Sequence, residues 1–455
     1  MNRWIGPGAV VAVLAVATAA SALAGPPPLP ETPFAATETR SSVVCPGFAS
    51  ATGAVRVAAT ATGPGLRTAP VTDPGKATDA SGLHVVDAPG APVRVSALLP
   101  APFGATTVVA AATGPDRGLS AAACLAPATD HWFAGADIRT IAQSEVVVAN
   151  LDGSQASVDV LAYGADGRIT APRGVLVDGN AVETISLGGL DRVSGPITLR
   201  VSSGDGRVAA FVRQRTWQLD VPLGADWLPA TVAPATDLVV PGIPSGEGTR
   251  SLVLTNPGDR TATVAVSSLT TDGPADLVGV EQVEVPPETT RTVDLQAGLD
   301  ARPAALRITA TQPVAAAVWL DTGGGDARRD PAYTAALPPL PQDSVWPVAL
   351  GRGAATVLQL ANPGASDAVV TLATGTGAEP GAPTDVTVPA GAILEVPLPK
   401  AAATVVRVQT AAGDLRGAIV STEKLGKVRG LAVLDLAAGG NRTEVPVVFD
   451  PHAGS

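Results

Sequence analysis

The chain carries the same asparagine-centred turn three times at a fixed spacing. An apolar run rich in Val and Leu ends at Asn150, Asn256 or Asn362, a short turn containing Gly follows, and a second apolar run begins. The two intervals are equal, since 256 − 150 = 106 and 362 − 256 = 106. A period of this length indicates a repeated domain, and it limits what a chain of 455 residues can fold into.

The residues between the turns favour β-structure. Val and Ala occur in short runs that are interrupted by 49 Gly and 42 Pro, and no long stretch after the N-terminus has helical periodicity. Six or seven short strands in each period of roughly 105 residues are typical of an immunoglobulin-like β-sandwich. We therefore predict an all-β protein of four tandem immunoglobulin-like sandwiches. A propeller blade or a solenoid coil is much shorter than this period, which disfavours both alternatives.

Each repeat contains three recurrent blocks. The first is the asparagine turn, the second is a strand, a tight turn and a strand, and the third has the pattern of a β-hairpin. The second block lies at 177–187, 285–295 and 388–398, with a looser first copy at 86–98. The third lies at 107–124, 197–212, 305–320 and 405–420.

The blocks also predict the domain boundaries. Residues 1–25 form an N-terminal signal peptide or anchor, and residues 26–40 form a Pro-rich spacer. The four sandwiches are expected at residues 41–129, 130–235, 236–341 and 342–450.

The N-terminal segment predicts export. A basic start at Arg3 precedes an uncharged, mostly apolar run over residues 5–25, and Ala22-Leu-Ala24 fits a small-x-small cleavage site. One interpretation is cleavage after Ala24. The other is an uncleaved helix, since about 20 apolar residues can span a bilayer of roughly 30 Å. Both place the chain from Pro26 onward outside the cytoplasm, either secreted or tethered to the membrane.

The charge balance excludes one class of partner. The formal net charge is −11, and no block of Lys or Arg interrupts the acidic excess. Phosphate binding needs a basic patch, so we expect no nucleic-acid partner.

The two cysteines, Cys45 and Cys124, are predicted to form a disulfide, because an even pair in an exported protein is usually oxidised. Cys45-Pro-Gly47 also resembles the asparagine turn, and 150 − 45 = 105 is close to the repeat interval. We therefore align Cys45 with the repeated asparagine, which makes the disulfide a feature of the first sandwich alone.

No arrangement of residues indicates catalysis or metal binding. The three histidines, His84, His131 and His452, do not pair at metal-ligand spacing, and no nucleophile elbow or phosphate-binding loop occurs. Asp130-His131 beside Cys124 is interpreted as an exposed histidine next to a disulfide cysteine. Calcium at the scattered Asp-Gly turns lacks a supporting Asp-x-Asp-x-Asp cluster. We predict no catalytic, cofactor-binding or metal-binding residues.

Two recurrent side-chain types allow a second interpretation. Trp132, Trp227 and Trp346 lie near repeat boundaries, where large aromatics commonly fill the joints between domains. The same three could instead form a platform on which sugar rings stack. A third set, Arg200, Arg307 and Arg407, recurs in the third block and either covers apolar surface or forms an anion-binding stripe.

Several of these features together resemble a known group. The signal or anchor, Cys45-Pro-Gly47 with Cys124, Asp130-His-Trp-Phe133 and the Asn-Pro-Gly repeats are similar to an uncharacterised family of actinobacterial envelope proteins, classed as a domain of unknown function. The resemblance covers nearly the whole chain and implies export and a bacterial origin. It supplies no catalytic or binding residue.

The sequence therefore predicts a non-catalytic, extracytoplasmic scaffold or protein-interaction protein of the bacterial cell envelope, whose partner is an envelope protein or glycan. The alternative is an envelope glycan-binding protein that uses the inter-domain tryptophans. An enzyme is disfavoured, although sandwich folds host many functions.

Overall fold

The computed structural model describes residues 39–437, apart from residues 51, 140–141, 191–193, 220, 281, 324, 326–328 and 378–379. The predicted signal or anchor and nearly all of the Pro-rich spacer lie outside the described residues. Every feature below belongs to the unit of residues 40–455. Among the described residues, no helix has both the length and the apolar character to cross a bilayer.

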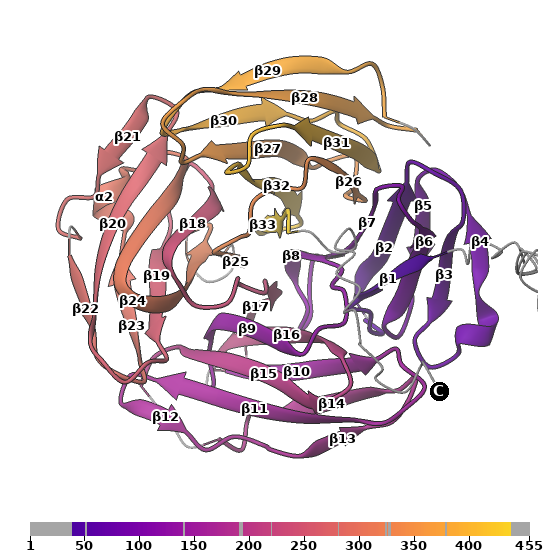
Figure 1. The fold of residues 1–455 in the computed structure, drawn as a ribbon, viewed down its shortest axis with the longest axis horizontal. Helices are drawn as coiled ribbons and strands as arrows, with labels where there is room; N and C mark the ends of the chain where they lie inside the picture. Colours follow the sequence, from indigo (N-terminus) through magenta and orange to yellow (C-terminus); the bar gives the residue numbers. More distant parts are fainter. Residues whose placement is uncertain are drawn as a thin grey trace, which may run out of the picture. The chain divides into compact units, whose positions relative to one another are not determined.

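The prediction of an all-β protein is confirmed. The described chain consists of antiparallel strands β1 to β33, with a single-turn helix α2 (Gln296–Leu299) and a short 3₁₀ turn η1 (Pro74–Lys76). The strands form four successive groups, and each group is built from two sheets whose facing sides enclose an apolar core (Figure 1). We call these groups sandwiches 1 to 4.

Sandwich 1 has sheets of strand order β1-β6-β3-β4 and β5-β2-β7-β8. Its strands are β1 (Arg40–Cys45), β2 (Gly53–Ala61), β3 (Leu66–Pro70), β4 (Thr78–Ala80), β5 (His84–Asp87), β6 (Val93–Leu98), β7 (Phe103–Ala111) and β8 (Gly118–Ala123).

Sandwich 2 has sheets β12-β11-β15-β9, with β13 also paired to β11, and β14-β10-β16-β17. Its strands are β9 (Asp130–Ala136), β10 (Ala142–Asn150), β11 (Ala156–Gly164), β12 (Gly167–Ile169), β13 (Val175–Val177), β14 (Val182–Ser186), β15 (Ile197–Asp205), β16 (Val208–Gln218) and β17 (Val221–Leu228).

Sandwich 3 differs in that one long strand, β24, belongs to both sheets. Its first half pairs with β18 and β20, and its second half pairs with β19 and β25. The strands are β18 (Ala235–Ile243), β19 (Arg250–Asn256), β20 (Ala262–Thr270), β21 (Gly273–Asp276), β22 (Val283–Val285), β23 (Thr289–Asp294), β24 (Ala304–Asp321) and β25 (Pro331–Ala335).

Sandwich 4 has sheets β26-β31-β28-β29 and β30-β27-β32-β33. Its strands are β26 (Asp343–Val348), β27 (Ala355–Asn362), β28 (Ala368–Gly375), β29 (Thr384–Val388), β30 (Ala392–Pro397), β31 (Thr404–Thr410), β32 (Arg416–Leu425) and β33 (Val428–Asp435).

The strand order does not confirm the prediction that the sandwiches are immunoglobulin-like, because only part of the pairing agrees. In sandwich 1 the second strand pairs with the fifth and the third with the sixth, as strands B–E and C–F do in immunoglobulin domains. The first strand, however, joins the third and sixth strands, and the seventh joins the second and fifth. Compared with an immunoglobulin domain, the first and seventh strands have therefore exchanged sheets. The eighth strand extends the sheet that contains the second strand.

The third block is a hairpin in sandwich 1, where β7 pairs with β8 as predicted. At 197–212, 305–320 and 405–420 the block is not a hairpin, so the prediction is wrong for these three copies. Strand β15 pairs with β9 and β11, whereas β16 pairs with β10 and β17 in the opposite sheet. In sandwich 3 the two strands are not separated by a turn at all, because β24 runs on for 18 residues. A short turn between apolar runs indicates a change of direction, but it does not specify whether the second strand pairs with the first.

The asparagine turn has the same hydrogen bonds in all three copies. The Asn256 side chain donates through Nδ2 to the carbonyls of Arg260 (2.6 Å) and Val285 (3.0 Å), and its Oδ1 accepts from the N–H of Gly258 at 3.0 Å. Asn150 and Asn362 make the equivalent bonds. The amide thus ties the end of the second strand to the turn and to the start of the second block.

Substitution of Asn256 by Ala should lower the free energy of unfolding by roughly 2–3 kcal/mol, because the buried Val285 carbonyl, the Arg260 carbonyl and the Gly258 N–H lose their partner. Chemical denaturation of the full chain measures this. Thr261→Ala, on the exposed side of the same turn, is the matched control and should change stability by less than about 0.5 kcal/mol. Equal stability of the two variants would contradict the structural role of the amide.

The predicted disulfide is present, with Cα atoms of Cys45 and Cys124 4.3 Å apart. Its alignment with the asparagine turn is wrong. Cys45 ends β1, the first strand of its sandwich, whereas Asn150, Asn256 and Asn362 end second strands. The Cys-Pro-Gly tripeptide can form the same kind of turn. It follows the first strand of a sandwich, however, whereas the asparagine turns follow second strands.

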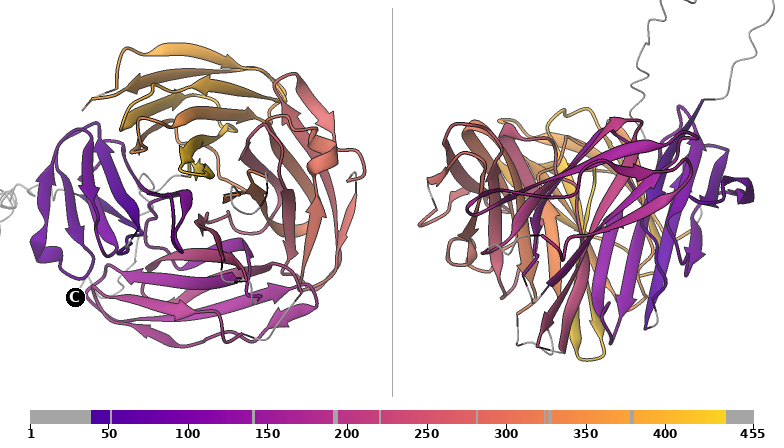
Figure 2. Two further views of the ribbon diagram at one scale, coloured as in Figure 1. Left: turned by 180° about the vertical axis from the view of Figure 1, so that it is seen from behind. Right: turned by 90° about the horizontal axis from the view of Figure 1, so that it is seen from below.

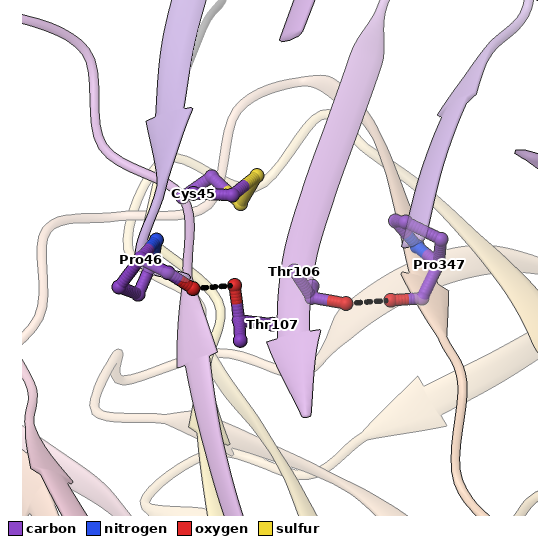
Figure 3. Close-up of a disulfide and its surroundings, with 6 residues drawn as sticks. Cys45, Pro46, Thr106, Thr107 and Pro347 are labelled. Atoms are coloured by element: carbon purple, nitrogen blue, oxygen red, sulfur yellow. Dashed lines mark hydrogen bonds between the residues drawn. A yellow bond between two sulfur atoms is a disulfide. The ribbon is translucent and has the colours of Figure 1, made fainter. Parts of the chain in front are cut away.

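The four sandwiches close into a ring, because sandwich 4 packs against sandwich 1. Figure 3 shows this joint beside the disulfide: Thr107 of β7 donates to the Pro46 carbonyl of its own sandwich (2.8 Å), and Thr106 donates to the Pro347 carbonyl of sandwich 4 (2.7 Å). Gly104 lies so close to Val345 that a Cβ atom there would come within 1.9 Å of its carbonyl oxygen. The four sandwiches, which follow one another along the chain, are therefore arranged in a closed circle.

The last strand of each sandwich lies at the middle of the ring, where β8, β17, β25 and β33 contact one another in turn (Figures 1 and 2). The apolar cores extend across these contacts. Leu119 of β8 belongs to the core of sandwich 4, and Leu431 and Val433 of β33 belong to the core of sandwich 3. The central strands thus join four cores into one packed unit.

Candidate functional site

The tryptophans predicted as a ligand platform are buried. Trp132, Trp227 and Trp346 are 5%, 4% and 4% exposed. The first stacks on Tyr163 with ring centroids 6.0 Å apart, and the second lies 6.1 Å from the Phe48 ring. This packing matches the joint-filling interpretation and leaves no open ring face on which a sugar could stack.

Each of the recurrent arginines forms an ion pair with an aspartate. Each reaches across to an aspartate on the first strand of its own sandwich, and the pairs are Arg200–Asp130 (2.9 Å), Arg307–Asp237 (3.2 Å) and Arg407–Asp343 (2.7 Å). The hydrogen bonds with their aspartates raise the pKa of Arg200 and of Arg407. The row is therefore a repeated cross-strand ion pair, and it does not form a free anion-binding stripe.

The prediction of an exposed His131 is wrong. Its ring is 8% exposed, and Nε2 lies 2.8 Å from the carbonyl oxygen of Val208. Burial lowers the pKa of His131, so the ring is held neutral. Within the described residues, no group of three or more His, Cys, Asp or Glu is arranged to hold a metal ion.

The centre of the ring contains three buried carboxyl groups that sequence reasoning missed: Asp226 of β17, Asp330 next to β25, and Asp435 at the end of β33. Oδ2 of Asp330 accepts from the N–H groups of Leu119 (2.9 Å) and Leu431 (2.8 Å), which belong to sandwiches 1 and 4. Burial raises the pKa of all three carboxyls, that of Asp435 to about 8. This cluster joins the sandwiches and is closed to solvent, so we regard it as structural.

The joint between sandwiches 1 and 2 holds a second buried polar group. Asp116 pairs with Arg213 and, at 2.9 Å, with Arg215, which also binds Glu145 at 2.9 Å. The Arg213 guanidinium lies 3.4 Å from the Phe48 ring centroid. Burial, with the nearby Arg215 charge, lowers the pKa of Arg213 to about 10. Every charge here has a partner, so this cluster also belongs to the joint.

One open cleft combines apolar walls with several polar groups. It lies between sandwiches 2 and 3 and has a volume of ≈ 400 Å³. Clefts of roughly 300–1,000 Å³ with mostly apolar walls and a few convergent polar groups are the usual form of small-molecule sites. Its lining residues are Gly135, Asp137, Arg139, Gly195, Pro196, Gln214, Thr216, Leu223, Ser251, Val253, Thr292, Trp319, Arg329, Pro331 and Tyr333.

The wall from sandwich 3 is the outer face of the sheet β23-β19-β24-β25. Ser251, Trp319 and Tyr333 lie directly opposite one another on neighbouring strands, and Thr292 is opposite Val253 in a nearby row. Residues directly opposite in an antiparallel sheet share a face. The alternate residues of β24, including Val318 and Leu320, point into the core of sandwich 3. Trp319 therefore faces away from its own core.

The wall from sandwich 2 is shaped by a bulge. Gly135 has φ +101°, and the register of β9 with β15 shifts there, since Ile197 pairs with Ala136 and Thr198 with Ala134. A glycine with positive φ permits the extra residue and bends the strand. A Cβ atom at Gly135 would lie 3.6 Å from the Tyr333 ring, an ordinary contact distance, so the bulge faces the wall from sandwich 3.

The floor of the cleft is held rigidly. Gln214 donates to the hydroxyl of Tyr333 (2.7 Å) and accepts from the N–H of Asp137 (2.6 Å) and from the Ser144 hydroxyl (3.2 Å). Burial raises the pKa of Tyr333 well above its ordinary value. The Arg139 guanidinium binds both oxygens of Asp137, which raises the pKa of Arg139. Gln214 and the Tyr333 hydroxyl thus make the base of the cleft polar, and the charges of Arg139 and Asp137 offset each other.

The rim of the cleft, by contrast, carries polar groups that are not engaged. Among the described residues, no hydrogen bond is seen for the indole N–H of Trp319 or for the hydroxyls of Ser251, Thr216 and Thr292, and all four side chains are at least partly exposed. Nearby hydroxyls differ, since Thr198, Thr255 and Thr290 form a buried chain with separations of 2.6 and 2.8 Å. The rim can therefore hydrogen-bond a ligand without losing internal bonds.

The cleft was not predicted, although one local signal was present. In β24 the residues alternate, with Val314, Ala316, Val318 and Leu320 on one face and Ala315, Ala317 and Trp319 on the other. A strand whose outer face is Ala, Ala and Trp indicates close approach of a neighbour followed by a large aromatic at its edge. The partners from sandwich 2 could not be inferred, because they depend on how the sandwiches dock.

Comparison with known proteins identifies a family but not an activity. No curated protein matches the chain. Among solved structures, a Thermotoga maritima protein titled "Crystal Structure of Thermotoga maritima 1070" is 24% identical over 23% of this chain and 93% of its own, with a TM-score of 0.20, and this likeness carries no inference about function. A family profile described as a family of unknown function (DUF5719) matches residues 84–399. The chain belongs to this family of unknown function.

Proposed function

We propose that the protein is a non-catalytic, extracytoplasmic scaffold or protein-interaction protein of the bacterial cell envelope. The observation that supports this is the closed ring. Its four joints hold the sandwiches in fixed positions through buried contacts such as Thr106–Pro347 and Asp330–Leu431. The short strands β4, β12, β21 and β29 lie at sheet edges on the outside of the ring (Figure 1), where added strands could pair.

Export is supported by the disulfide, because such bonds persist mainly in oxidising compartments. The test is to fractionate host cells, alkylate free thiols under denaturing conditions and measure the mass of the full chain. We expect Cys45 and Cys124 to be unmodified in the envelope or medium fraction. Modified cysteines in a cytoplasmic pool that contains most of the protein would contradict the proposed location.

The scaffold function can be tested in the native host with photo-crosslinking residues placed one at a time on β4, β12, β21 and β29. A scaffold should crosslink to the same defined partners from particular sandwiches, and Lys or Pro substitutions at those edges should abolish each crosslink. Purified full-length protein should not turn over cell-wall polymers or ester substrates. Turnover that a single point substitution abolishes would instead identify an enzyme.

A second candidate function is glycan binding, and a specific observation favours it. Trp319 is only partly buried and lines the cleft between sandwiches 2 and 3, whereas Trp132, Trp227 and Trp346 are packed. The aromatic platform suggested by the sequence thus has one open candidate, at a position that the sequence-based hypothesis did not select.

A further inference from the structure

We propose that the cleft between sandwiches 2 and 3 binds one ring of a neutral polysaccharide, with the ring stacked beside Trp319. This inference rests on the second candidate function and specifies its ligand class and its residues. It does not depend on the scaffold function.

The first argument is the combination of an aromatic surface with unengaged donors. Apolar walls supply most of the cleft, and the free polar groups of its rim are neutral: the indole N–H of Trp319 and the hydroxyls of Ser251 and Thr292. A pyranose has the complementary chemistry, because one face presents C–H groups and its edge presents hydroxyls. A purely apolar ligand would leave these donors unpaired.

The second argument is charge. The cleft contains Asp137 and two arginines, Arg139 and Arg329, but each arginine lies beside a carboxylate. Arg139 binds Asp137, and Nε of Arg329 is 3.4 Å from Oδ2 of Asp321. An anionic ligand would have to compete with those carboxylates, so the balance favours a neutral sugar over a uronate or a phosphorylated one.

The third argument is preorganisation. The Gln214 network fixes Tyr333 and the backbone of Asp137 before any ligand arrives, and Trp319 is held between Ser251 and Tyr333 in the sheet. A ligand would not need to order these groups, which reduces the entropic cost of binding. The rim hydroxyls and the aromatic face therefore lie on a rigid support.

The test is a titration of the full-length protein with glucose, galactose, mannose and N-acetylglucosamine and with short neutral oligosaccharides built from them, followed by calorimetry or saturation-transfer NMR. Glucuronate is the charged comparator. We expect at least one neutral sugar to bind, and Trp319→Ala to weaken its affinity by roughly ten-fold or more. Trp217→Ala removes another partly exposed tryptophan, outside the cleft, and should leave affinity unchanged.

Trp319 also packs at the joint, so a second variant keeps the test decisive. Thr292 is exposed, and Thr292→Arg should block the cleft while thermal stability and circular dichroism stay at wild-type values. Retained sugar binding in a folded Thr292→Arg protein would overturn the proposed site. Absence of binding to every neutral sugar, or a ten-fold preference for glucuronate, would overturn the ligand class, whereas edge-strand crosslinks in the host would still support the scaffold function.

Discussion

Substitution of Asp330 by Ala is expected to destabilise the ring by about 2–6 kcal/mol. The side chain is fully buried, and its Oδ2 is the shared acceptor for the N–H groups of Leu119 and Leu431. Removing it leaves two buried donors unpaired, at roughly 1–3 kcal/mol each. The carboxyl is closely packed, since a Cβ at Gly118 or Gly224 would come within 1.9 or 3.0 Å of Asp330 Oδ1.

The effect should appear as loss of cooperativity as well as loss of stability. Asp330 belongs to sandwich 3, its hydrogen bonds reach sandwiches 1 and 4, and Gly224 of sandwich 2 lies against it. Denaturation of the variant, followed by intrinsic fluorescence and by circular dichroism, should give transitions that no longer coincide. Small-angle scattering should show a larger radius of gyration if the ring opens.

Two controls separate the hydrogen bonds from the removal of a charge. Asp330→Asn retains an acceptor for both N–H groups, and burial already favours the neutral form of Asp330, so this variant should keep most of the wild-type stability. Asp272→Ala removes an exposed carboxylate at a turn and should change the unfolding free energy by less than about 0.5 kcal/mol. Wild-type stability in Asp330→Ala would show that the carboxyl does not hold the ring together.

Stability should also fall as the pH rises from 6.5 to 8. Burial raises the pKa of Asp435 to about 8, although the N–H of Ala335 and the hydroxyl of Thr334 both donate to it and partly oppose the shift. An aspartate in the unfolded chain has a pKa of about 3.9. Between the two values the folded protein retains a proton that the unfolded chain has lost, so raising the pH favours unfolding.

The size of this effect follows from the slope of about 1.4 kcal/mol per pH unit for each such group. Asp435 alone should therefore contribute a loss of about 2 kcal/mol between pH 6.5 and 8. Asp226 and Asp330 act in the same direction, because burial raises their pKa values as well. His131 has the opposite influence, since its lowered pKa reduces stability as the pH falls through about 6.5.

Urea denaturation at pH 6.5, 7.25 and 8 measures the slope directly, and above about pH 7 His131 is mostly neutral in both states. Asp435→Asn should make the dependence shallower, and Asp272→Asn, at an exposed turn, should leave it unchanged. A free energy of unfolding that stays constant or increases over this range would contradict the assignment of protonated carboxyls to the centre of the ring.

Most features that sequence reasoning predicted correctly depend on short stretches of chain. The turn at Asn256 is encoded by residues within a few positions of it, and Val285, its more distant partner, begins the next recognisable block. Strand positions could be predicted for the same reason, because the alternation of apolar and polar residues and the Gly/Pro turns extend over about ten residues. The disulfide could be predicted because the chain contains only two cysteines.

The errors occur where a local pattern has more than one tertiary outcome. Cys-Pro-Gly47 has the chemistry of the asparagine turn, yet Cys45 ends the first strand of its sandwich and the asparagines end the second. The third block has strand–turn–strand character, yet β15 and β16 lie in opposite sheets. His131 follows a disulfide cysteine in a polar-looking segment, yet it is buried.

The amino-acid sequence by itself determined an all-β chain, its repeated turns and its single disulfide, because these depend on turn chemistry, alternation and cysteine count. Only the tertiary structure decided that the sandwiches close into a ring, that Asp330 joins them, and that Trp319 lines an open cleft while three other tryptophans are packed. Asp330 meets its partners across 211 and 101 residues of sequence. Contacts of that separation arise from the docking of whole sandwiches, and no local pattern records them.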